Sequence, residues 1–573
     1  MEFLKGAIQV LGAATGANTP YTRGALIASQ PGNTLWTLYS GVRTADSLDV
    51  SIFFFDGQKA PERLPLAKNA FKRFRTLRHP SIVGYLDGTE TPTSVEIVTE
   101  QVTPLSHVLR GLMSQNMTGG VTDAHSTIMW GLYKLAHLLK FLNQDGSIVH
   151  GNIRIDSIFV TKAGEWKLGG MEMASSMKED NSALYSIMER LFNYEKYLPP
   201  EMRLRSPQPN MTKTVDSYAY GCLVHELYNG PGSLDHVGQT RDNIPSGLFP
   251  YVRSLVASDS KLRSSFDTFL TAGSAPGSFF DNELIKAANF LENITLKDQD
   301  ERDAFVSHLD EVASELPDEF CRYKVLPELR HALEFGGAGP KVLGLVLKIS
   351  SKLPKDEFEQ TILRSIIKMF SSPDRQTRIA LLDNLPHFID SFDAKVLNDK
   401  VFPQIVLGFS DTIPFMREHT LKSMLLLIPK LNERTINNDL LRYLAKLQAD
   451  EEAGIRTNTT VLLGKMSKHL SDATRKRVLI PAFVRSLRDP FPPARIAGLL
   501  AMAATSDFHD PPEVAVRALP AISPLLVDPD KQVRESAFRA METLLEKLGR
   551  LSAEMVTKVL LYTSPFLTTD IHG

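Results

Sequence analysis

A group of neighbouring cations lies between residues 63 and 86, a stretch without any acidic residue. Residues three and four apart are neighbours on a helix, so Lys68, Lys72 and Arg75 share one face of the helix predicted here. Such a face fits phosphate, tRNA or an acidic partner, and a plain solvated helix face is the simpler interpretation. The cations of this stretch are Arg63, Lys68, Lys72, Arg73, Arg75 and Arg78, and the last five form the candidate binding face.

The chain offers little for metal or disulfide chemistry. Its two cysteines, Cys222 and Cys321, belong to no C-x-x-C pair. We therefore expect no metal, no cofactor and no disulfide framework, and a reducing, cytoplasmic setting. No apolar run reaches the length of a membrane-spanning helix, so membrane association would be peripheral.

Composition excludes several classes of protein. The 573 residues carry a net charge of −2, with 43% hydrophobic and 23% charged residues. These values are typical of soluble globular proteins and argue against disorder and collagen-like structure. The balanced charge also argues against non-specific coating of nucleic acid or membrane, although a local basic patch remains compatible with it.

Two parts of the chain differ in periodicity. Alternating, β-branched stretches at 35–39, 50–55 and 94–98 predict strands, and residues 64–77 predict a helix between them. Helical spacing dominates from residue 126, with short strands expected at 158–160 and 166–168. After a linker-like stretch at 271–278, almost everything is predicted to be helical.

The second part contains an internal repeat of 39 residues. An arginine recurs at that interval five times, and an aspartate precedes each of the last four by six residues. A period near 40 predicts two-helix HEAT-type repeats, in which Asp could cap the second helix and Asp–Arg pairs could form a ladder between repeats. The ladder residues are Arg378, Asp411, Arg417, Asp450, Arg456, Asp489, Arg495, Asp528 and Arg534.

Several stretches of the first part resemble the scaffold of a protein kinase domain. Residues 77–83 (Leu-Arg-His-Pro-Ser-Ile-Val) are similar to the turn after kinase helix C, and Pro-Pro-Glu ending at Glu201 is similar to the A-P-E segment. Asp216 opens a stretch like kinase helix F. The resemblance implies that Glu201 and Arg263 form an ion pair and that Asp216 holds the catalytic-loop backbone.

The positions that perform phosphoryl transfer in kinases are changed. Transfer needs a lysine on the third strand, a glutamate on helix C, a catalytic aspartate, and an Asn and an Asp for Mg²⁺. An amide cannot replace the base, and the resemblance implies a pseudokinase that binds no ATP. In that order, the residues found are Phe53, Ala70, Asn152, Ser157 and Gly170. The alternative is that Lys59 or Asp156 substitutes for a lost catalytic group, in which case the domain would still be an enzyme.

The combination of a degenerate kinase domain with helical repeats resembles the SCY-like family of N-terminal kinase-like proteins. Stretches at 71–80, 98–105, 150–152 and 165–170 carry the likeness. It implies a scaffold in Golgi-to-ER traffic with COPI coat subunits and small Arf GTPases, or a role in nuclear tRNA export with tRNA, tRNA synthetases or nuclear-export factors. The implied locations are the cytoplasm, Golgi and ER–Golgi membranes, and the cytoplasmic side of nuclear pores. Family members usually carry a further C-terminal tail, so we expect this sequence to be shortened.

We therefore predict an α+β kinase-like bilobal domain followed by an all-α HEAT-repeat solenoid. An atypical kinase with residual ATP binding and a direct tRNA-binding protein are the alternatives to a non-catalytic scaffold. The expected parts are an N-terminal segment (1–20), a small lobe (21–105), a large lobe (106–275), irregular helical repeats (283–371) and 39-residue repeats (372–573).

Overall fold

The computed structural model describes residues 20–29, 34–115, 121–178, 194–203, 213–230, 233–335 and 340–563. The predicted N-terminal segment, apart from Pro20, and the last ten residues lie outside this part. The chain divides into two compact units, Met1–Pro327 and Glu328–Gly573, which are described separately.

The first unit begins with a five-stranded antiparallel sheet in the order β1-β2-β3-β5-β4. The register pairs Phe53 of β3 with Leu38 of β2 and with Ile97 of β5. Helix α2 (Leu64–Thr76) has an apolar face that includes Leu66, Ala70 and Phe74, all buried. The strands are β1 (Tyr21–Ser29), β2 (Thr37–Arg43), β3 (Asp49–Asp56), β4 (Tyr85–Glu90) and β5 (Ser94–Glu100).

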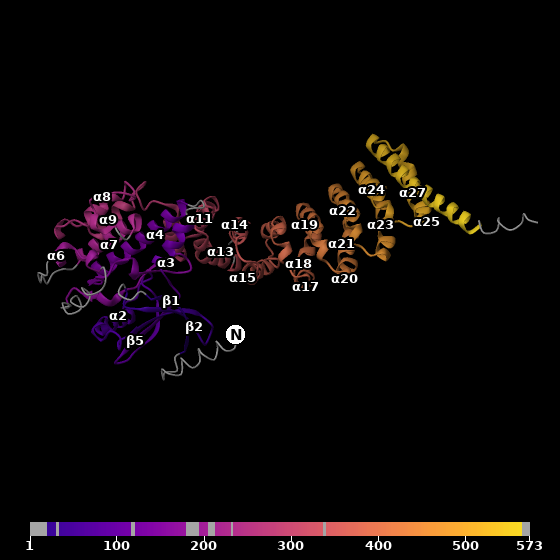
Figure 1. The fold of residues 1–573 in the computed structure, drawn as a ribbon. Coiled ribbons are helices and arrows are strands. Elements are labelled where there is room, and N and C mark those ends of the chain that lie inside the picture. Colours follow the sequence, from indigo (N-terminus) through magenta and orange to yellow (C-terminus); the bar gives the residue numbers. More distant parts are fainter. Residues whose placement is uncertain are drawn as a thin grey trace, which may run out of the picture. The chain divides into compact units, whose positions relative to one another are not determined.

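The larger lobe is mainly helical and carries short strands that shape the site. Its small sheets join β6 (Thr103–Pro104) to β8 (Ile158–Val160) and β9 (Trp166–Leu168), and β7 (Ile148–Val149) to β10 (Ser175–Ser176). The predicted strands and the kinase-like arrangement are therefore confirmed (Figure 1). Its longer helices are α3 (Leu105–Gln115), α4 (Val121–Lys140), α7 (Lys213–Asn229), α8 (Phe249–Leu255) and α9 (Phe266–Gly273).

Helices that follow the kinase-like lobes belong to the same compact unit. The ring of Phe320 meets that of Trp130 on α4 edge-on, with centroids 5.3 Å apart. Lys134, also on α4, pairs with Glu292 at 2.5 Å. The helices α10 (Glu283–Glu292) and α12 (Asp318–Phe320) of the predicted irregular repeats thus pack on the large lobe, and α11 (Gln299–Val312) packs on α10 through the stacked rings of Phe290 and Phe305.

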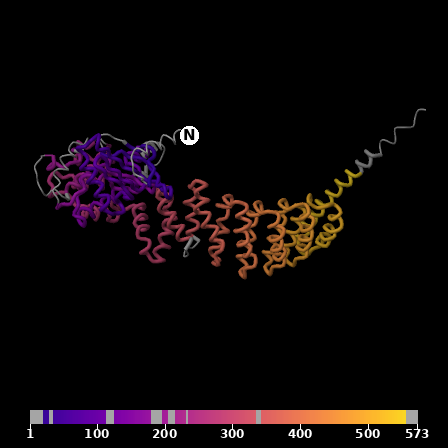
Figure 2. The backbone as a smooth tube through the Cα atoms, turned by 90° about the horizontal axis from the view of Figure 1, so that it is seen from below, coloured from indigo at the N-terminus to yellow at the C-terminus, as the bar shows by residue number. Residues whose placement is uncertain are grey.

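The second unit consists of packed helix pairs stacked in sequence order, which confirms the predicted all-helical region (Figure 2). The inner contacts run between the second helices of successive pairs, α19 to α22 and α22 to α24. The main helices are α14 (Pro340–Ser350), α15 (Lys355–Met369), α16 (Arg375–Asp383), α18 (Phe402–Ile405), α19 (Pro414–Leu427), α21 (Leu441–Leu447), α22 (Ala453–Met466), α23 (Asp472–Ser486), α24 (Pro492–Ala504), α26 (Leu519–Ile522) and α27 (Lys531–Thr563).

An arginine–aspartate ladder connects three successive steps of this stack. Each arginine donates to the aspartate 33 residues later, in the next pair, and its Nη1 donates to the carbonyl of the aspartate six residues before it. These contacts tie each repeat to its neighbour. The side-chain pairs are Arg417–Asp450 (Nε–Oδ2, 2.8 Å), Arg456–Asp489 (Nε–Oδ2, 2.7 Å) and Arg495–Asp528 (Nη2–Oδ1, 2.9 Å).

The first step differs from the 39-residue pattern. Asp411 accepts from Arg375 at 3.1 Å, because α16 begins at Arg375 and places it beside the next turn. Arg378 instead donates to the carbonyl of Gln404 at 3.3 Å, whereas Arg534 keeps the regular backbone contact, from its Nη1 to the carbonyl of Asp528 at 2.7 Å. A uniform interval in the sequence therefore does not guarantee the same partner at each step.

The aspartates hold the turns between helices and do not cap the helices themselves. Asp489 accepts the backbone N–H of Phe491, and α24 begins one residue later, at Pro492. Asp411 and Asp450 accept in the same way from Ile413 and Glu452. The expected helix cap is wrong because the side chain bonds before the first helical residue.

We expect Asp489→Asn to lower the free energy of unfolding of the repeats by about 1.5–3 kcal/mol, the range for hydrogen bonds to charged groups. Asp489 pairs with Arg456, and the two side chains are 9% and 16% exposed, respectively. The hydrogen bonds from Arg456 lower the pKa of Asp489. The ionised Asp489 therefore contributes to the free energy of unfolding above its unfolded pKa of about 3.9. This contribution is lost as the pH falls through the lower pKa of the folded state.

Urea denaturation followed by far-UV circular dichroism measures this effect. Asp472→Asn is the matched control, since Asp472 is 86% exposed and pairs only with Arg475 on its own helix, which predicts less than about 0.5 kcal/mol. Equal effects of the two variants at pH 7 would contradict the ladder's role.

Candidate functional site

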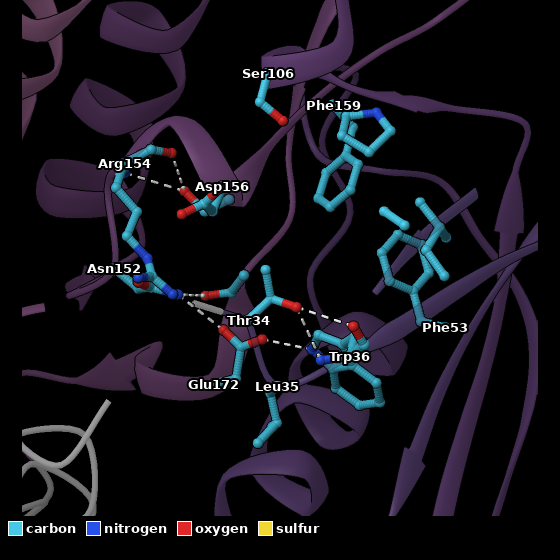
Figure 3. A pocket seen from close by; sticks show the side chains of 15 residues that line it. Thr34, Leu35, Trp36, Phe53, Ser106, Asn152, Arg154, Asp156, Phe159 and Glu172 are labelled. Carbon is cyan, nitrogen blue, oxygen red and sulfur yellow. Dashed lines mark hydrogen bonds between the residues drawn. The ribbon is translucent and has the colours of Figure 1, made fainter. Parts of the chain in front are cut away.

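A small pocket lies between the sheet and the large lobe, at the place where a kinase binds its nucleotide (Figure 3). Strands β2 and β3 supply its roof, and the segments before β8 and after β9 supply its floor. Most of the changed catalytic positions meet here. Its lining includes Trp36, Phe53, Asn152, Ser157, Phe159 and Gly170.

Phe53, which the sequence assigns to the position of the kinase lysine, lies on β3 and lines the pocket. It meets Phe159 edge-on with ring centroids 5.1 Å apart, and Trp36 with centroids 6.3 Å apart. Phe53 is 4% exposed. A lysine there would bind the triphosphate, whereas this cluster is apolar and fills the space above the floor of the pocket.

A buried polar network replaces the charges that a kinase uses for Mg²⁺ and phosphate. The indole Nε1 of Trp36 donates to Glu172 Oε1 at 2.5 Å, and Asn152 Nδ2 donates to Glu172 Oε2 at 3.0 Å. Asn152, at the position of the catalytic base, also donates to the carbonyl of Gly170 at 3.1 Å. The carboxylate of Glu172 would repel a triphosphate at close range.

The two positions that hold Mg²⁺ in kinases are closed by local geometry. Gly170 has φ +63°, and a Cβ there would lie 2.6 Å from the Cβ of Ser157 and 2.9 Å from Nδ2 of Asn152. Ser157 is 2% exposed, and its hydroxyl donates to the carbonyl of Arg154 at 2.8 Å. No metal-binding group of three or more His, Cys, Asp or Glu occurs in the described part of the chain.

Helix α2 reaches the site through an amide and carries no glutamate there. Ala70, which the sequence comparison assigns to the glutamate position, is fully buried. Its neighbour Asn69 donates to the carbonyl of Glu172 at 2.7 Å and to that of Ala174 at 3.2 Å. The helix is thus fixed to the segment after β9 by neutral hydrogen bonds, where a kinase uses a Lys–Glu ion pair.

The remaining cavity has a volume of about 40 Å³. A cavity needs about 10–15 Å³ to hold one water molecule, so this space suits a few waters and is far too small for a nucleotide.

The two candidate displaced groups, Asp156 and Lys59, lie in different surroundings. Asp156 lines the pocket, and burial raises its pKa, with Arg154 opposing the shift. Lys59 is 86% exposed on a turn beside Asp56, and it does not line this pocket. A carboxyl without a lysine or a metal-binding position does not make a phosphoryl-transfer site.

The scaffold below the pocket is fully assembled. The buried carboxylate of Asp216 accepts from the backbone N–H of His150 and of Gly151, both at 2.8 Å, and from Asn143 Nδ2 at 2.9 Å. Burial lowers the pKa of His150, and its Nε2 bonds to the carbonyl of Gly169 at 2.8 Å. Neutral His150 therefore ties the loop before β8 to the segment after β9.

Glu201 and Arg263 form a two-pronged ion pair. Arg263 donates from Nη1 to Oε1 at 2.5 Å and from Nη2 to Oε2 at 2.7 Å. The arginine side chain is fully covered. The pair lies at the base of the large lobe and leaves the scaffold of a kinase intact around a closed site.

The basic face of α2 is smaller than the sequence indicates. Arg73 is buried, because it shares the inward side of the helix with Ala70 and Phe74, and Lys68 pairs with Glu90 at 3.1 Å. Lys72, Arg75 and Arg78 are exposed. Arg73 is therefore not part of a binding face.

Sequence reasoning missed three residues of the site. Trp36 and Glu172 are 136 residues apart, and Asn69 meets the backbone of residues over 100 positions away. The sequence does contain one signal for Glu172, because it stands between two methionines in a stretch of apolar and small residues that are usually buried. A charged residue in such a setting is rarely buried without partners.

Comparisons with known proteins agree with this geometry. The protein kinase domain family matches residues 58–307. The "Probable inactive serine/threonine-protein kinase scy1" of Dictyostelium discoideum is 38% identical over 534 residues, which are 93% of this chain and 63% of the relative. The chain belongs to the SCY1-like kinase-domain family. The family suggested by the sequence is therefore confirmed, although the chain spans less than two thirds of that relative.

Two further SCY1-like comparisons concern yeast. The "Cytoplasmic export protein 1" of Saccharomyces cerevisiae is 29% identical over 90% of this chain and 67% of its own length. The crystal structure of Cex1p has a TM-score of 0.66 and 27% identity, covering 94% of this chain and 97% of that one. The likeness thus includes both the kinase-like domain and the helix pairs. In the described part of the chain, no helix is long and apolar enough to span a membrane.

Proposed function

We propose that this protein is a catalytically inactive, kinase-like scaffold that binds no Mg·ATP. The observation that carries the proposal is the packing of Phe53 against Phe159 in the place of a nucleotide, above a cavity of about 40 Å³. The scaffold residues Asp216 and Arg263 keep their contacts, so the domain retains a stable surface without its chemistry. Titration with Mg·ATP tests this proposal.

We propose that this scaffold serves nuclear tRNA export. The support is the likeness to the yeast cytoplasmic export protein over most of both chains, together with the tRNA role implied by the family resemblance. Golgi-to-ER transport with COPI coat subunits and Arf GTPases rests on the family resemblance alone, as do tRNA synthetases and nuclear-export factors as partners.

Direct tRNA binding is a second candidate, favoured by the exposed cations of α2. We expect the double variant Lys72→Glu/Arg75→Glu to weaken binding of total tRNA in filter-binding assays. Each phosphate contact contributes about −0.9 to the slope of log K against log salt, so the slope should become shallower by about two. Lys446→Glu, an exposed lysine of the second unit, is the control. Unchanged affinity and slope in the double variant would remove α2 as a tRNA site.

A further inference from the structure

A groove of about 480 Å³ lies where helices α19, α22 and α24 end. These are the second helices of three successive repeats and lie side by side (Figure 1). The lining of the groove is mixed: polar and basic residues share it with the apolar residues Leu425, Ile428, Met466, Ala504 and Phe508. Ile428 and Met466 are buried, while Leu425 is 41% exposed.

The charged residues that line this groove are all basic. Lys465, Lys468 and His469 are exposed, and none of them makes an ion pair with another described residue. Two nearby acids have cations of their own, since Asp472 pairs with Arg475 at 2.8 Å and Asp510 pairs with Lys476 at 3.0 Å, while Asp507, next to Phe508, is exposed. Positive charge at the groove is therefore left uncompensated by the two paired acids.

The helix end beneath these cations does not counteract them. Carbonyl groups at the end of a helix carry partial negative charge and disfavour an anion. Here Arg475 donates to the carbonyl of Ser467 at 2.8 Å and to that of Lys468 at 3.1 Å. Its guanidinium also lies 4.2 Å from the ring centre of Phe508, which fixes that part of the lining.

Further exposed apolar side chains lie on the same helices near the groove. Val461 and Leu500 lie one turn before Lys465 and Ala504, with 37% and 54% exposure, and Leu426 next to Leu425 is 39% exposed. Exposed apolar side chains that cluster on a soluble protein are typical of an interaction site.

We propose that this groove binds an acidic peptide segment of a partner protein. An aliphatic or aromatic side chain of the peptide inserts between Leu425 and Phe508, and its carboxylates pair with Lys465 and Lys468. This inference is independent of tRNA export. RNA is the less suitable ligand because Arg475 already covers Phe508, and two lysines beside apolar surface provide little phosphate neutralisation.

Selection of random phage-displayed dodecapeptides on the full chain tests the proposal. We expect enriched peptides to share an apolar residue flanked by Asp or Glu. Their fluorescence-anisotropy affinity should fall about tenfold or more in Lys465→Glu/Lys468→Glu, mainly at low salt, and should fall in Leu425→Ala at any salt. Lys446→Glu, an exposed lysine outside the groove, should bind as the unchanged protein does.

The proposal would be overturned if no motif were enriched, or if the enriched peptides bound both groove variants as tightly as the unchanged protein. It would also be overturned if poly(U) competed with the peptides and the lysine variants abolished this competition. The last would assign the groove to RNA. Far-UV circular dichroism of each variant separates a lost contact from a lost fold, and Leu425→Ala provides a readout that does not change the charge.

Discussion

Replacing Asp216 with alanine is expected to lower the free energy of unfolding of the kinase-like unit by about 3–5 kcal/mol, because three buried hydrogen bonds to one charged group are lost together. The substitution removes the acceptor of the backbone N–H groups of His150 and Gly151, and it removes one of two acceptors of the Asn143 amide, which keeps its bond to the carbonyl of Ile148. Each unsatisfied buried group costs about 1–3 kcal/mol. The loop that would be catalytic in a kinase should then lose its fixed conformation.

The three tryptophans of the chain, Trp36, Trp130 and Trp166, all lie in this unit, so fluorescence during urea denaturation reports its unfolding. Asp235→Ala is the matched control, because Asp235 is 66% exposed and pairs with Lys196 at 3.5 Å. We expect less than about 0.5 kcal/mol for the control. A similar small effect at Asp216 would show that the carboxylate does not hold the loop.

Restoring the metal-binding aspartate by Gly170→Asp should destabilise the same unit by about 3–5 kcal/mol, because three costs add. The left-handed backbone at φ +63° costs an L-residue about 1–2 kcal/mol, and forcing a Cβ to within 2.6 Å of Ser157 is overpacking, which costs about 1–3 kcal/mol. A carboxylate at this place would also be buried close to Glu172.

Gly164→Asp is a control that separates the cost of the left-handed backbone from the costs of overpacking and of the buried charge. Gly164 has φ +78°, but the nearest atom to an added Cβ is 3.8 Å away, on Trp130. It should therefore show the backbone cost alone, about 1–2 kcal/mol. If the two variants unfold at the same urea concentration, the position of the kinase aspartate is open and the closed-site account fails there.

Local patterns predicted several elements of this fold, although they did not single out β1 or β4. Alternating β-branched and aromatic residues identified β3 and β5, and the predicted helix at 64–77 corresponds to α2. The 39-residue interval identified the helix pairs because each repeat presents the same residues to its neighbours. Fixed spacing also located the substitutions at Phe53, Asn152 and Gly170, since motif positions can be counted along the chain.

What the sequence could not provide depends on contacts between distant segments. Glu172 gains its partners only when β2 and the segment after β9 come together. Counting cations also overestimated the basic face, because Arg73 turns inward with Phe74. At the first ladder step, Arg375 takes the place expected for Arg378, since the start of α16 decides which arginine reaches Asp411.

Thermal unfolding of the full chain, followed by tryptophan fluorescence with increasing Mg·ATP, tests the central claim most directly. A nucleotide bound with a dissociation constant a hundredfold below its concentration would stabilise the unit by about 2.7 kcal/mol, a shift of several degrees. The filled pocket predicts no saturable shift and no transfer of the γ-phosphate to peptide or protein. A saturable rise in Tm accompanied by phosphate transfer would contradict it and identify an atypical kinase.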